Sequence, residues 1–259
     1  MAADLRSRAR DDLPRWGRRE PAWRLLGPPL TAAVHGLFEV RTGGLHHVPR
    51  RGPALVVANH IGHLDPLVLA MTLLRDAGRR ARFLALAELF DDPVVGWWLR
   101  RGGAIPVQRG RGLGPVVAAA TDALEHGEVV VIYPEGRLPR GQTPAARPGA
   151  GAIALATAAP TLPVGLWGMQ AELPGPRVRR PVAVEVGAPR WAHDLGSDDP
   201  RAVSTALLGS IRAELLPRAR RRCGFPADYP DVDPERVVEA TGSTWRTTKL
   251  LARRMLGRR

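Results

Sequence analysis

A histidine and an aspartate stand close together in a segment that suits acid–base chemistry. His60 and Asp65 follow the apolar run Ala54–Ala58, which predicts a buried strand. On a regular helix their spacing would separate the two side chains by roughly 140°. Asp65 and Pro66, however, have the pattern of an N-cap followed by a first-turn proline, so His60 is expected in the turn before a helix. There the chain can fold back and let Asp65 reach the imidazole.

Such a pair would form a general base, because a carboxylate on one ring nitrogen fixes the tautomer and leaves the other nitrogen free to accept a proton. The sequence has no G-x-S-x-G nucleophile, so the proton would come from the substrate itself, such as an alcohol. Two other interpretations stay open. Asp65 could only cap the helix while His60 is a satisfied turn residue. His63 could instead join the pair in a metal site, although a fourth ligand at a diagnostic spacing is missing.

Polar residues also follow two other predicted strands. Arg109 follows the short run AIPV, and the strongly apolar run VVVIYP leads to Glu135, Gly136 and Arg137. In an open parallel sheet, ligands bind beyond the carboxyl ends of the strands, so these residues are expected to meet the histidine–aspartate pair at one edge. Guanidinium groups bind phosphate through two parallel hydrogen bonds, and two arginines after adjacent strands would supply anion recognition. Glu135 has no visible basic partner; it could order Arg137, His60 or the loop backbone.

Strands and helices alternate along the chain, and several strands are apolar on both faces. This pattern is typical of a largely parallel sheet covered on both sides. We predict an α/β fold with a mixed, largely parallel sheet flanked by helices, and an amphipathic N-terminal helical segment. The strand at 182–186 alternates with charge and is expected at an edge. Strands are predicted at 38–41, 54–58, 81–86, 104–107, 129–133, 162–168 and 182–186, and helices at 66–75, 93–101, 116–125, 149–159 and 200–219.

Four short blocks of this sequence resemble those of the glycerophospholipid acyltransferases of the PlsC-like kind, the 1-acylglycerol-3-phosphate acyltransferases. The segment 59–65 (NHIGHLD) resembles their N-H-x-x-x-x-D signature. The segments 103–109 (GAIPVQR), 133–137 (YPEGR) and 162–164 (LPV) resemble their second, third and fourth blocks. All four occur in the family's order, and the resemblance covers roughly residues 35–215.

The resemblance implies the glycerolipid acyltransferase fold and transfer of a fatty acyl group from a thioester to an alcohol. His60 would deprotonate the free hydroxyl of a lysophospholipid, and Asp65 would orient His60. The acceptor would be 1-acylglycerol-3-phosphate, with glycerol-3-phosphate, a lyso-ornithine lipid or another lysolipid as alternatives. Acyl-CoA or acyl-carrier protein would be the co-substrate, with no cofactor and no metal. The implied substrate-binding residues are Asn59, Arg109, Glu135, Gly136 and Arg137.

The sequence departs from the family pattern at three places. Gly62 stands where the family often has serine, and His63 where it often has an aromatic residue. In the third block Arg137 follows Gly136 directly, without the usual threonine, and Arg140 could share the anion role. The first two differences leave the proposed base and its partner intact, whereas the third bears on the phosphate contacts.

Most of the excess positive charge is expected at the two ends of the chain. The chain has 38 basic and 25 acidic residues, a net charge of +13, and its one cysteine excludes a disulfide framework. Basic, aromatic and aliphatic residues mix near both ends, which favours an anionic membrane surface as a partner. We therefore predict a membrane-docking segment at 1–38, an acyltransferase domain at 39–220 and a basic extension at 221–259. The protein would lie peripherally on the cytoplasmic face of the cell membrane.

Two functions of other classes remain as alternatives. A catalytically silent lipid-binding protein could have the same fold, although the intact His60 and Asp65 argue against it. A nucleic-acid binder is suggested only by the high isoelectric point. The chain lacks a nucleic-acid recognition motif, and no nucleic acid is expected as a partner.

Overall fold

The computed structural model describes residues 21–138, 144–170 and 179–229. Several predictions concern residues outside these ranges. They are the first twenty residues of the docking segment, most of the basic extension, and Arg140. The domain boundaries at 38 and 220 therefore stay predictions.

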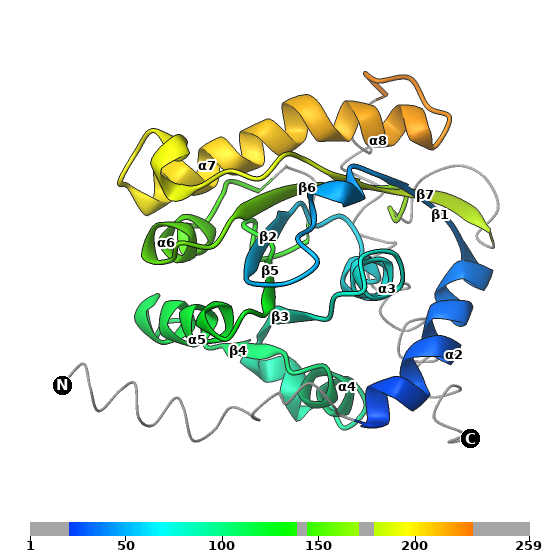
Figure 1. Cartoon of the computed structure of the whole chain (residues 1–259), viewed down its shortest axis with the longest axis horizontal. Helices are drawn as coiled ribbons and strands as arrows, with labels where there is room; N and C mark the ends of the chain where they lie inside the picture. Colours follow the sequence, from blue (N-terminus) through cyan, green and yellow to red (C-terminus); the bar gives the residue numbers. More distant parts are fainter. Residues whose placement is uncertain (1–20, 139–143, 171–178, 230–259) are drawn as a thin grey trace.

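Seven strands form one sheet. They are β1 (Phe38–Gly43), β2 (Ala54–Ala58), β3 (Ala81–Leu86), β4 (Ile105–Val107), β5 (Val129–Ile132), β6 (Thr161–Trp167) and β7 (Arg180–Val186). Their order across the sheet is β1-β7-β6-β2-β5-β3-β4 (Figure 1). Neighbouring strands run parallel, except that β6 and β7 are antiparallel. The predicted mixed, largely parallel sheet is confirmed.

The prediction of an edge position for the strand at 182–186 is wrong. β7 lies between β1 and β6, and Val182 and Val184 are fully buried. Glu185, the charged residue in this strand, is also buried and forms an ion pair with Arg222. A charge in a strand indicates exposure only when no partner neutralises it, and here the partner comes from the far end of the described chain. The two edges of the sheet are β1 and β4.

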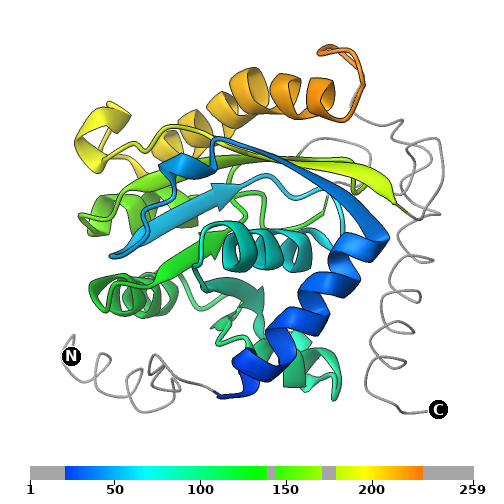
Figure 2. The same cartoon turned by 45° about the vertical axis from the view of Figure 1, so that its right-hand side comes forward.

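Helices cover both faces of the sheet (Figures 1 and 2). They are α2 (Pro21–Leu37), α3 (Asp65–Asp76), α4 (Val95–Arg101), α5 (Gly114–Glu125), α6 (Gly149–Ala156), α7 (Pro200–Ser210) and α8 (Leu216–Arg222). α2 and α3 share one core with the sheet, and α5, α6 and α7 share another on the opposite face. Alternation within β2 explains both cores, because Val56 joins the first while Leu55 and Val57 join the second.

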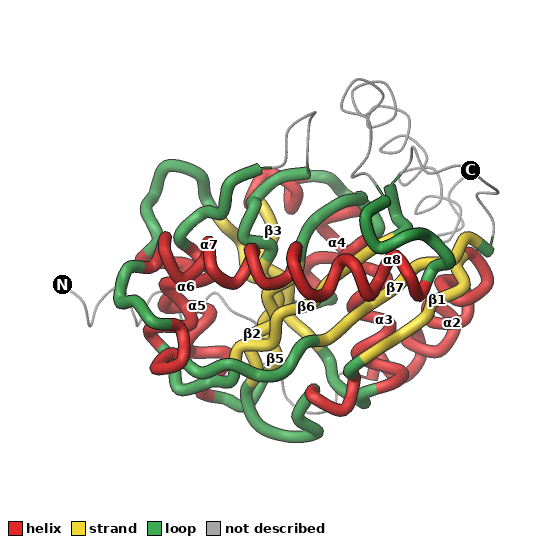
Figure 3. The backbone as a smooth tube through the Cα atoms, turned by 90° about the horizontal axis from the view of Figure 1, so that it is seen from above, coloured by secondary structure: helices red, strands yellow, loops and turns green. Residues whose placement is uncertain are grey.

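The predicted C-terminal helix is interrupted by a π-helical turn, Ile211–Leu215, which joins α7 to α8. Pro217 lies in the first turn of α8 and lacks the N–H that a regular helix would use there. Leu215 packs so closely on β6 that a Cβ on Gly165 would lie 2.7 Å from the Cβ of Leu215. Figure 3 shows this helical run crossing in front of the strands. The π-turn is therefore seated firmly on the sheet.

The N-terminal segment is helical from Pro21, with Pro28 and Pro29 inside α2. Leu30 and Val34 are buried in the core that α2 shares with α3. No helix in the ranges that the structure describes has both the length and the apolar character needed to cross a membrane.

Candidate active site

The carboxyl ends of β2, β5, β3 and β4 lie at one edge of the sheet, because these four neighbours are parallel. His60 follows β2, Glu135 follows β5 and Arg109 follows β4, so the sheet brings all three predicted clusters to this edge. This edge is where open parallel sheets bind ligands.

His60 and Asp65 form the contact that their pattern predicts. Nδ1 of His60 lies 2.8 Å from Oδ2 of Asp65. The same oxygen accepts the N–H groups of Ile61 at 2.6 Å and Gly62 at 2.9 Å. Asp65 is fully buried, so these bonds hold its carboxylate in one position. With Nδ1–H donated to the carboxylate, Nε2 of His60 keeps its lone pair and can accept a proton.

Asp65 does not cap the helix in the predicted way. It is the first residue of α3, whose N-cap is Leu64, and its carboxylate accepts N–H groups from the residues before the helix. The carboxylate therefore organises the turn that carries His60, and the interpretation of Asp65 as only a helix cap is wrong. The imidazole also stacks on the Tyr133 ring, with centroids 4.3 Å apart and planes 19° from parallel.

Glu135 connects the polar cluster that follows β5 to the one that follows β2. Its Oε2 accepts the backbone N–H of His60 at 2.7 Å, and the side chain is 4% exposed. Burial raises the pKa of Glu135 to about 7, although the His60 N–H and the charge of Arg212 act in the opposite direction. The sequence left Arg137, His60 and the loop backbone open as groups that Glu135 could order, and the structure shows the backbone N–H of His60 as a partner. Arg212, whose Nη2 lies 3.5 Å from Oε1, is a partner that the sequence analysis missed.

The two predicted anion-binding arginines follow strands that end at this edge of the sheet, but these strands are not adjacent as predicted. Arg109 and Arg137 are both exposed. They do not follow adjacent strands, because β3 lies between β4 and β5, which adds about 5 Å to their separation. Gly136 has φ +63°, and a Cβ there would come 2.6 Å from Cδ of Arg147. A glycine therefore lets Arg147 lie directly over the backbone next to Glu135.

Asn59 differs from the other predicted binding residues. Its amide donates to the carbonyl of Leu166 at 3.0 Å and accepts the Leu166 N–H at 2.7 Å. It is 2% exposed. These bonds join the end of β2 to β6, so the structure places Asn59 as a buried link between strands, not as an open contact for a substrate.

Gly62 and His63, the two residues of the first block that differ from the family pattern, have different environments in the structure. A Cβ on Gly62 would lie 2.7 Å from the carbonyl oxygen of Met169, so the serine common in the family would need the backbone to shift. His63 lies near His60, and burial, followed by the charge of His60, lowers its pKa. Among the residues that the structure describes, no group of three or more His, Cys, Asp or Glu could hold a metal ion.

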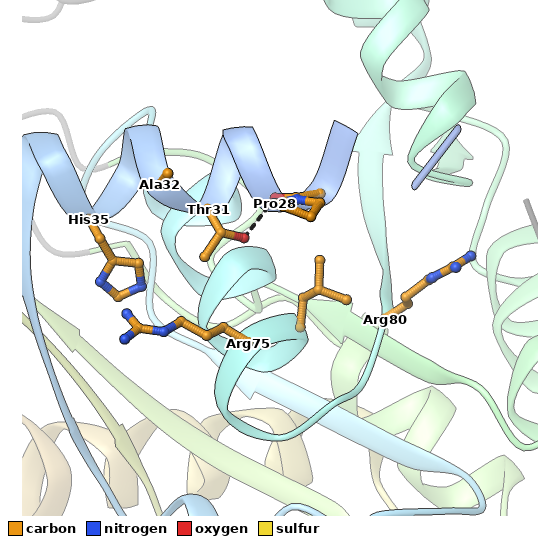
Figure 4. A pocket seen from close by; sticks show the side chains of 8 residues that line it. Pro28, Thr31, Ala32, His35, Arg75 and Arg80 are labelled. Atoms are coloured by element: carbon orange, nitrogen blue, oxygen red, sulfur yellow. Dashed lines mark hydrogen bonds between the residues drawn. The ribbon is translucent and has the colours of Figure 1, made fainter. Parts of the chain in front are cut away.

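A cavity of about 780 Å³ opens between α2 and α3, apart from this site (Figure 4). Pro28 and Leu74 form part of its apolar lining, while His35 and Arg75 lie beside it. Leu74 is near the C-terminal end of α3, whereas Asp65 begins that helix. The rise along nine residues of helix is about 14 Å, so the cavity lies away from the His60–Asp65 pair.

Comparisons with known proteins agree with this geometry. The family model described as "Acyltransferase" matches residues 39–167. The structure of the 1-acyl-sn-glycerophosphate acyltransferase PlsC from Thermotoga maritima has the same fold, with a TM-score of 0.58 and 22% sequence identity. That match covers 84% of this chain and 88% of the other chain.

Similar sequences include proteins with and without an assigned activity. An uncharacterised protein of Mycobacterium tuberculosis is 35% identical over 119 residues, which cover 43% of this chain and 30% of that relative. The chloroplastic 1-acyl-sn-glycerol-3-phosphate acyltransferase LPAT1 of Arabidopsis thaliana is 27% identical over 52% of this chain and 38% of its own length. The lyso-ornithine lipid O-acyltransferase of Rhodobacter capsulatus is 30% identical over 41% and 36%.

The matched regions thus span about a third of the length of these curated relatives. The family model begins in β1, ends at the last residue of β6, and so includes all four sequence blocks, with His60 and Asp65. The resemblance stated from those blocks is confirmed: residues 39–167 of this chain match the acyltransferase family model, and the chain has the fold of PlsC.

Proposed function

We propose that this protein transfers a fatty acyl group from acyl-CoA or acyl-carrier protein to the free hydroxyl of a lysophospholipid, with 1-acylglycerol-3-phosphate as the acceptor and phosphatidic acid as the product. The observation that carries the proposal is the contact between His60 Nδ1 and the fully buried Asp65 carboxylate. That contact leaves Nε2 as a base at an edge where a substrate can bind. His60 keeps 18% of its side chain exposed, so the imidazole is reachable.

The reaction needs one base and no acyl-enzyme intermediate. Nε2 of His60 takes the proton of the acceptor hydroxyl while the oxygen attacks the thioester carbonyl carbon. The bond from that carbon to sulfur then breaks, and the thiolate takes the proton from the imidazolium and leaves as a thiol. Asp65 holds the tautomer and stabilises the imidazolium. A positioned base contributes typically about 10²–10⁴ in rate, and the alignment of hydroxyl and thioester must supply much of the rest.

The acceptor's phosphate would bind to exposed guanidinium groups beside the base. Arg137 follows Glu135 by two residues, and Glu135 accepts the His60 N–H, which supports the assignment of Arg137 to an anion bound beside the imidazole. Arg109 would approach from two strands away. This arrangement suits a phosphorylated lysolipid, whose hydroxyl and phosphate are separated by only a glycerol backbone.

The test is thiol release by the purified protein with oleoyl-CoA, with and without 1-acylglycerol-3-phosphate in mixed micelles. We expect acceptor-dependent release that His60→Ala removes and that His126→Ala, a matched change at an exposed histidine, leaves unchanged. Parallel reactions with acyl-carrier protein, glycerol-3-phosphate and a lyso-ornithine lipid identify the donor and acceptor. Silence with every pair would support the catalytically silent lipid-binding protein instead.

We also propose that the protein acts at an anionic membrane surface on the cytoplasmic side, because its lipid substrates partition into a bilayer. The segment 240–259 carries six basic and no acidic residues, and each basic residue near an anionic surface contributes about 1 kcal/mol. Deleting 240–259 should weaken sedimentation with anionic vesicles and leave binding to neutral vesicles nearly unchanged. Equal sedimentation with and without the segment would exclude this contribution.

A further inference from the structure

Arg212 contacts two parts of the active site that are far apart in the sequence. Its Nη2 donates to the carbonyl of Pro144 at 2.9 Å and lies 3.5 Å from Oε1 of Glu135. The other oxygen of Glu135 accepts the backbone N–H of His60. One guanidinium group is thus linked, through a single buried carboxylate, to the turn that carries the base.

Buried side chains anchor the backbone around Arg212. Arg212 lies in the π-turn, between the buried Ile211 and Leu215. Leu215 packs tightly against Gly165 in β6. A π-turn shifts the side chains that follow it around the helix axis, and such turns are frequent at functional sites. Here the turn presents a guanidinium group to the edge of the sheet, although its residues lie outside the four sequence blocks.

The second contact of Arg212, with the carbonyl of Pro144, holds a segment that packs beside Glu135. Three residues after Pro144, the N–H of Arg147 donates to the carbonyl of Pro134 at 2.7 Å. Arg147 also lies over Gly136. The hydrogen bond from Arg212 to Pro144 therefore helps to hold the segment 144–147, and with it Arg147, next to Glu135.

We propose that Arg212 is a positioning residue for the acyl transfer, which holds Glu135 against the His60 backbone and ties the chain at 144–147 to the same carboxylate. This inference rests on the proposed function for its kinetic consequences. Arg212 does not need to touch the reacting atoms. It acts by keeping Glu135 ionised and aligned, because a cation 3.5 Å from a carboxylate favours the ionised form of that carboxylate.

The groups that face Glu135 explain why it needs a cation. Burial raises the pKa of this carboxyl to about 7, and the negative charge of Asp65 acts in the same direction. The His60 N–H, the Arg212 guanidinium and any charge on the His60 ring lower it. Removing Arg212 leaves Glu135 with a higher pKa, so its ionised form appears only at higher pH. The contact between Glu135 and the backbone N–H of His60 would then be weakened most near and below neutral pH.

The kinetic experiment compares the wild-type protein with Arg212→Gln, Arg212→Lys and the control Arg218→Gln, which removes an exposed arginine of α8. For Arg212→Gln we expect kcat at neutral pH to fall about fivefold, because moving the acid limb of the kcat profile up by about one pH unit lowers the ionised fraction of Glu135 at pH 7 from about one half to about one tenth. The loss should largely disappear near pH 9, with KM for acyl-CoA within about twofold of wild type. Arg212→Lys keeps the charge but has a shorter side chain than the one whose Nη2 reaches both Glu135 and Pro144, so its loss should be intermediate.

Amide hydrogen exchange supplies a readout that does not depend on turnover. Faster exchange in peptides that contain His60 and residues 144–147 is expected for Arg212→Gln and not for Arg218→Gln. An unshifted pH profile with unchanged exchange would overturn the proposal, as would equal losses in the Arg218 control. If the wild-type protein releases no thiol with any acceptor, the proposed function fails, and the exchange result alone decides whether Arg212 positions Glu135. Should Arg212→Gln not fold, Arg212→Lys still tests the proposal: its kcat should fall and its exchange at His60 and residues 144–147 should rise relative to Arg218→Gln, and wild-type values of both would overturn the proposal.

Discussion

The turn that carries His60 and the surface that carries the arginines differ in how firmly their side chains are held. One oxygen of the fully buried Asp65 contacts the imidazole and accepts two backbone N–H groups. Arg109 and Arg137, by contrast, are exposed at the ends of β4 and β5. The proposed base is therefore preorganised before any substrate binds, whereas the cations that would recognise the acceptor stay hydrated until it arrives.

This difference has a physical consequence for the two kinds of residue. Preorganised groups stabilise a transition state without the cost of reorienting them during the reaction. Exposed guanidinium groups lose side-chain freedom when they bind an anion, which offsets part of their attraction. Changes in the turn should therefore lower kcat, and changes among the exposed arginines should raise KM.

The largest effect is expected from His60→Ala, which should lower kcat by about 10²–10⁴. Asp65→Asn should also lower kcat strongly, because an amide cannot match a carboxylate as acceptor for three neighbouring donors. Steady-state kinetics with saturating acceptor, together with a thermal melt to confirm folding, measure both. His126→Ala is the control. A kcat within twofold of wild type in folded His60→Ala would exclude His60 as the general base.

Glu135 links the two regions and should make stability depend on pH. Its pKa is raised from the usual 4.5 to about 7, so the native state binds this proton more tightly than the unfolded chain does. The resulting stability is fully present below about pH 4.5 and is lost as the pH rises to 7, by an amount of about 3 kcal/mol. Glu135→Gln cannot ionise and should lack this loss.

Denaturant unfolding of wild type and Glu135→Gln across that pH window measures the difference. The gap in unfolding free energy between the two proteins should change in favour of the variant as the pH rises. A constant gap would mean that Glu135 titrates alike in both states. The same variant should lose activity, which would show that the ionised carboxylate serves the site at the expense of stability.

The sequence predicts the buried turn better than the long-range contacts. The run Ala54–Ala58 and the pattern of Asp65 before Pro66 are local signals, and they place His60 in a strand-to-helix turn beside Asp65. The sheet class follows from apolar strands that alternate with helices. In these cases neighbouring residues along the chain decide the outcome.

The missed features depend on partners that no local pattern identifies. Arg212 lies 77 residues from Glu135, and its position depends on the π-turn near Pro217. The charge of Glu185 led to the wrong prediction of an edge strand. Its neutralising partner, Arg222, lies 37 residues farther along the chain, so no local pattern shows that the charge is paired. The burial of a charge is a property of the whole fold, so its partner becomes visible only when the helices are placed on the sheet.

A smaller effect is expected from the exposed arginines, and the structure ranks them. Arg137→Ala should raise KM for 1-acylglycerol-3-phosphate by roughly tenfold, since a charge-assisted hydrogen bond contributes about 1.5–3 kcal/mol. Arg109→Ala should have a weaker effect, because β3 separates its strand from β5. KM for acyl-CoA should change less in both variants. Equal increases for donor and acceptor would contradict the assignment of these residues to the phosphate, and Arg218→Ala is the control.

The smallest effect is expected at Gly62, where the preorganised turn meets the end of β6. Gly62→Ser adds a Cβ 2.7 Å from the carbonyl oxygen of Met169, and the buried Asp65 accepts the N–H of this same residue. Overpacking of this kind costs about 1 kcal/mol or slightly more, and the strain should also move the His60 turn. Denaturant unfolding and kcat should therefore fall together in Gly62→Ser, whereas Gly78→Ser, at a glycine with open space around its Cβ but a positive φ, should lose stability without a matching loss of kcat. If Gly62→Ser kept both wild-type stability and wild-type kcat, the turn would be less tightly held than its hydrogen bonds indicate, and the contrast with the exposed arginines would narrow to the single contact between His60 and Asp65.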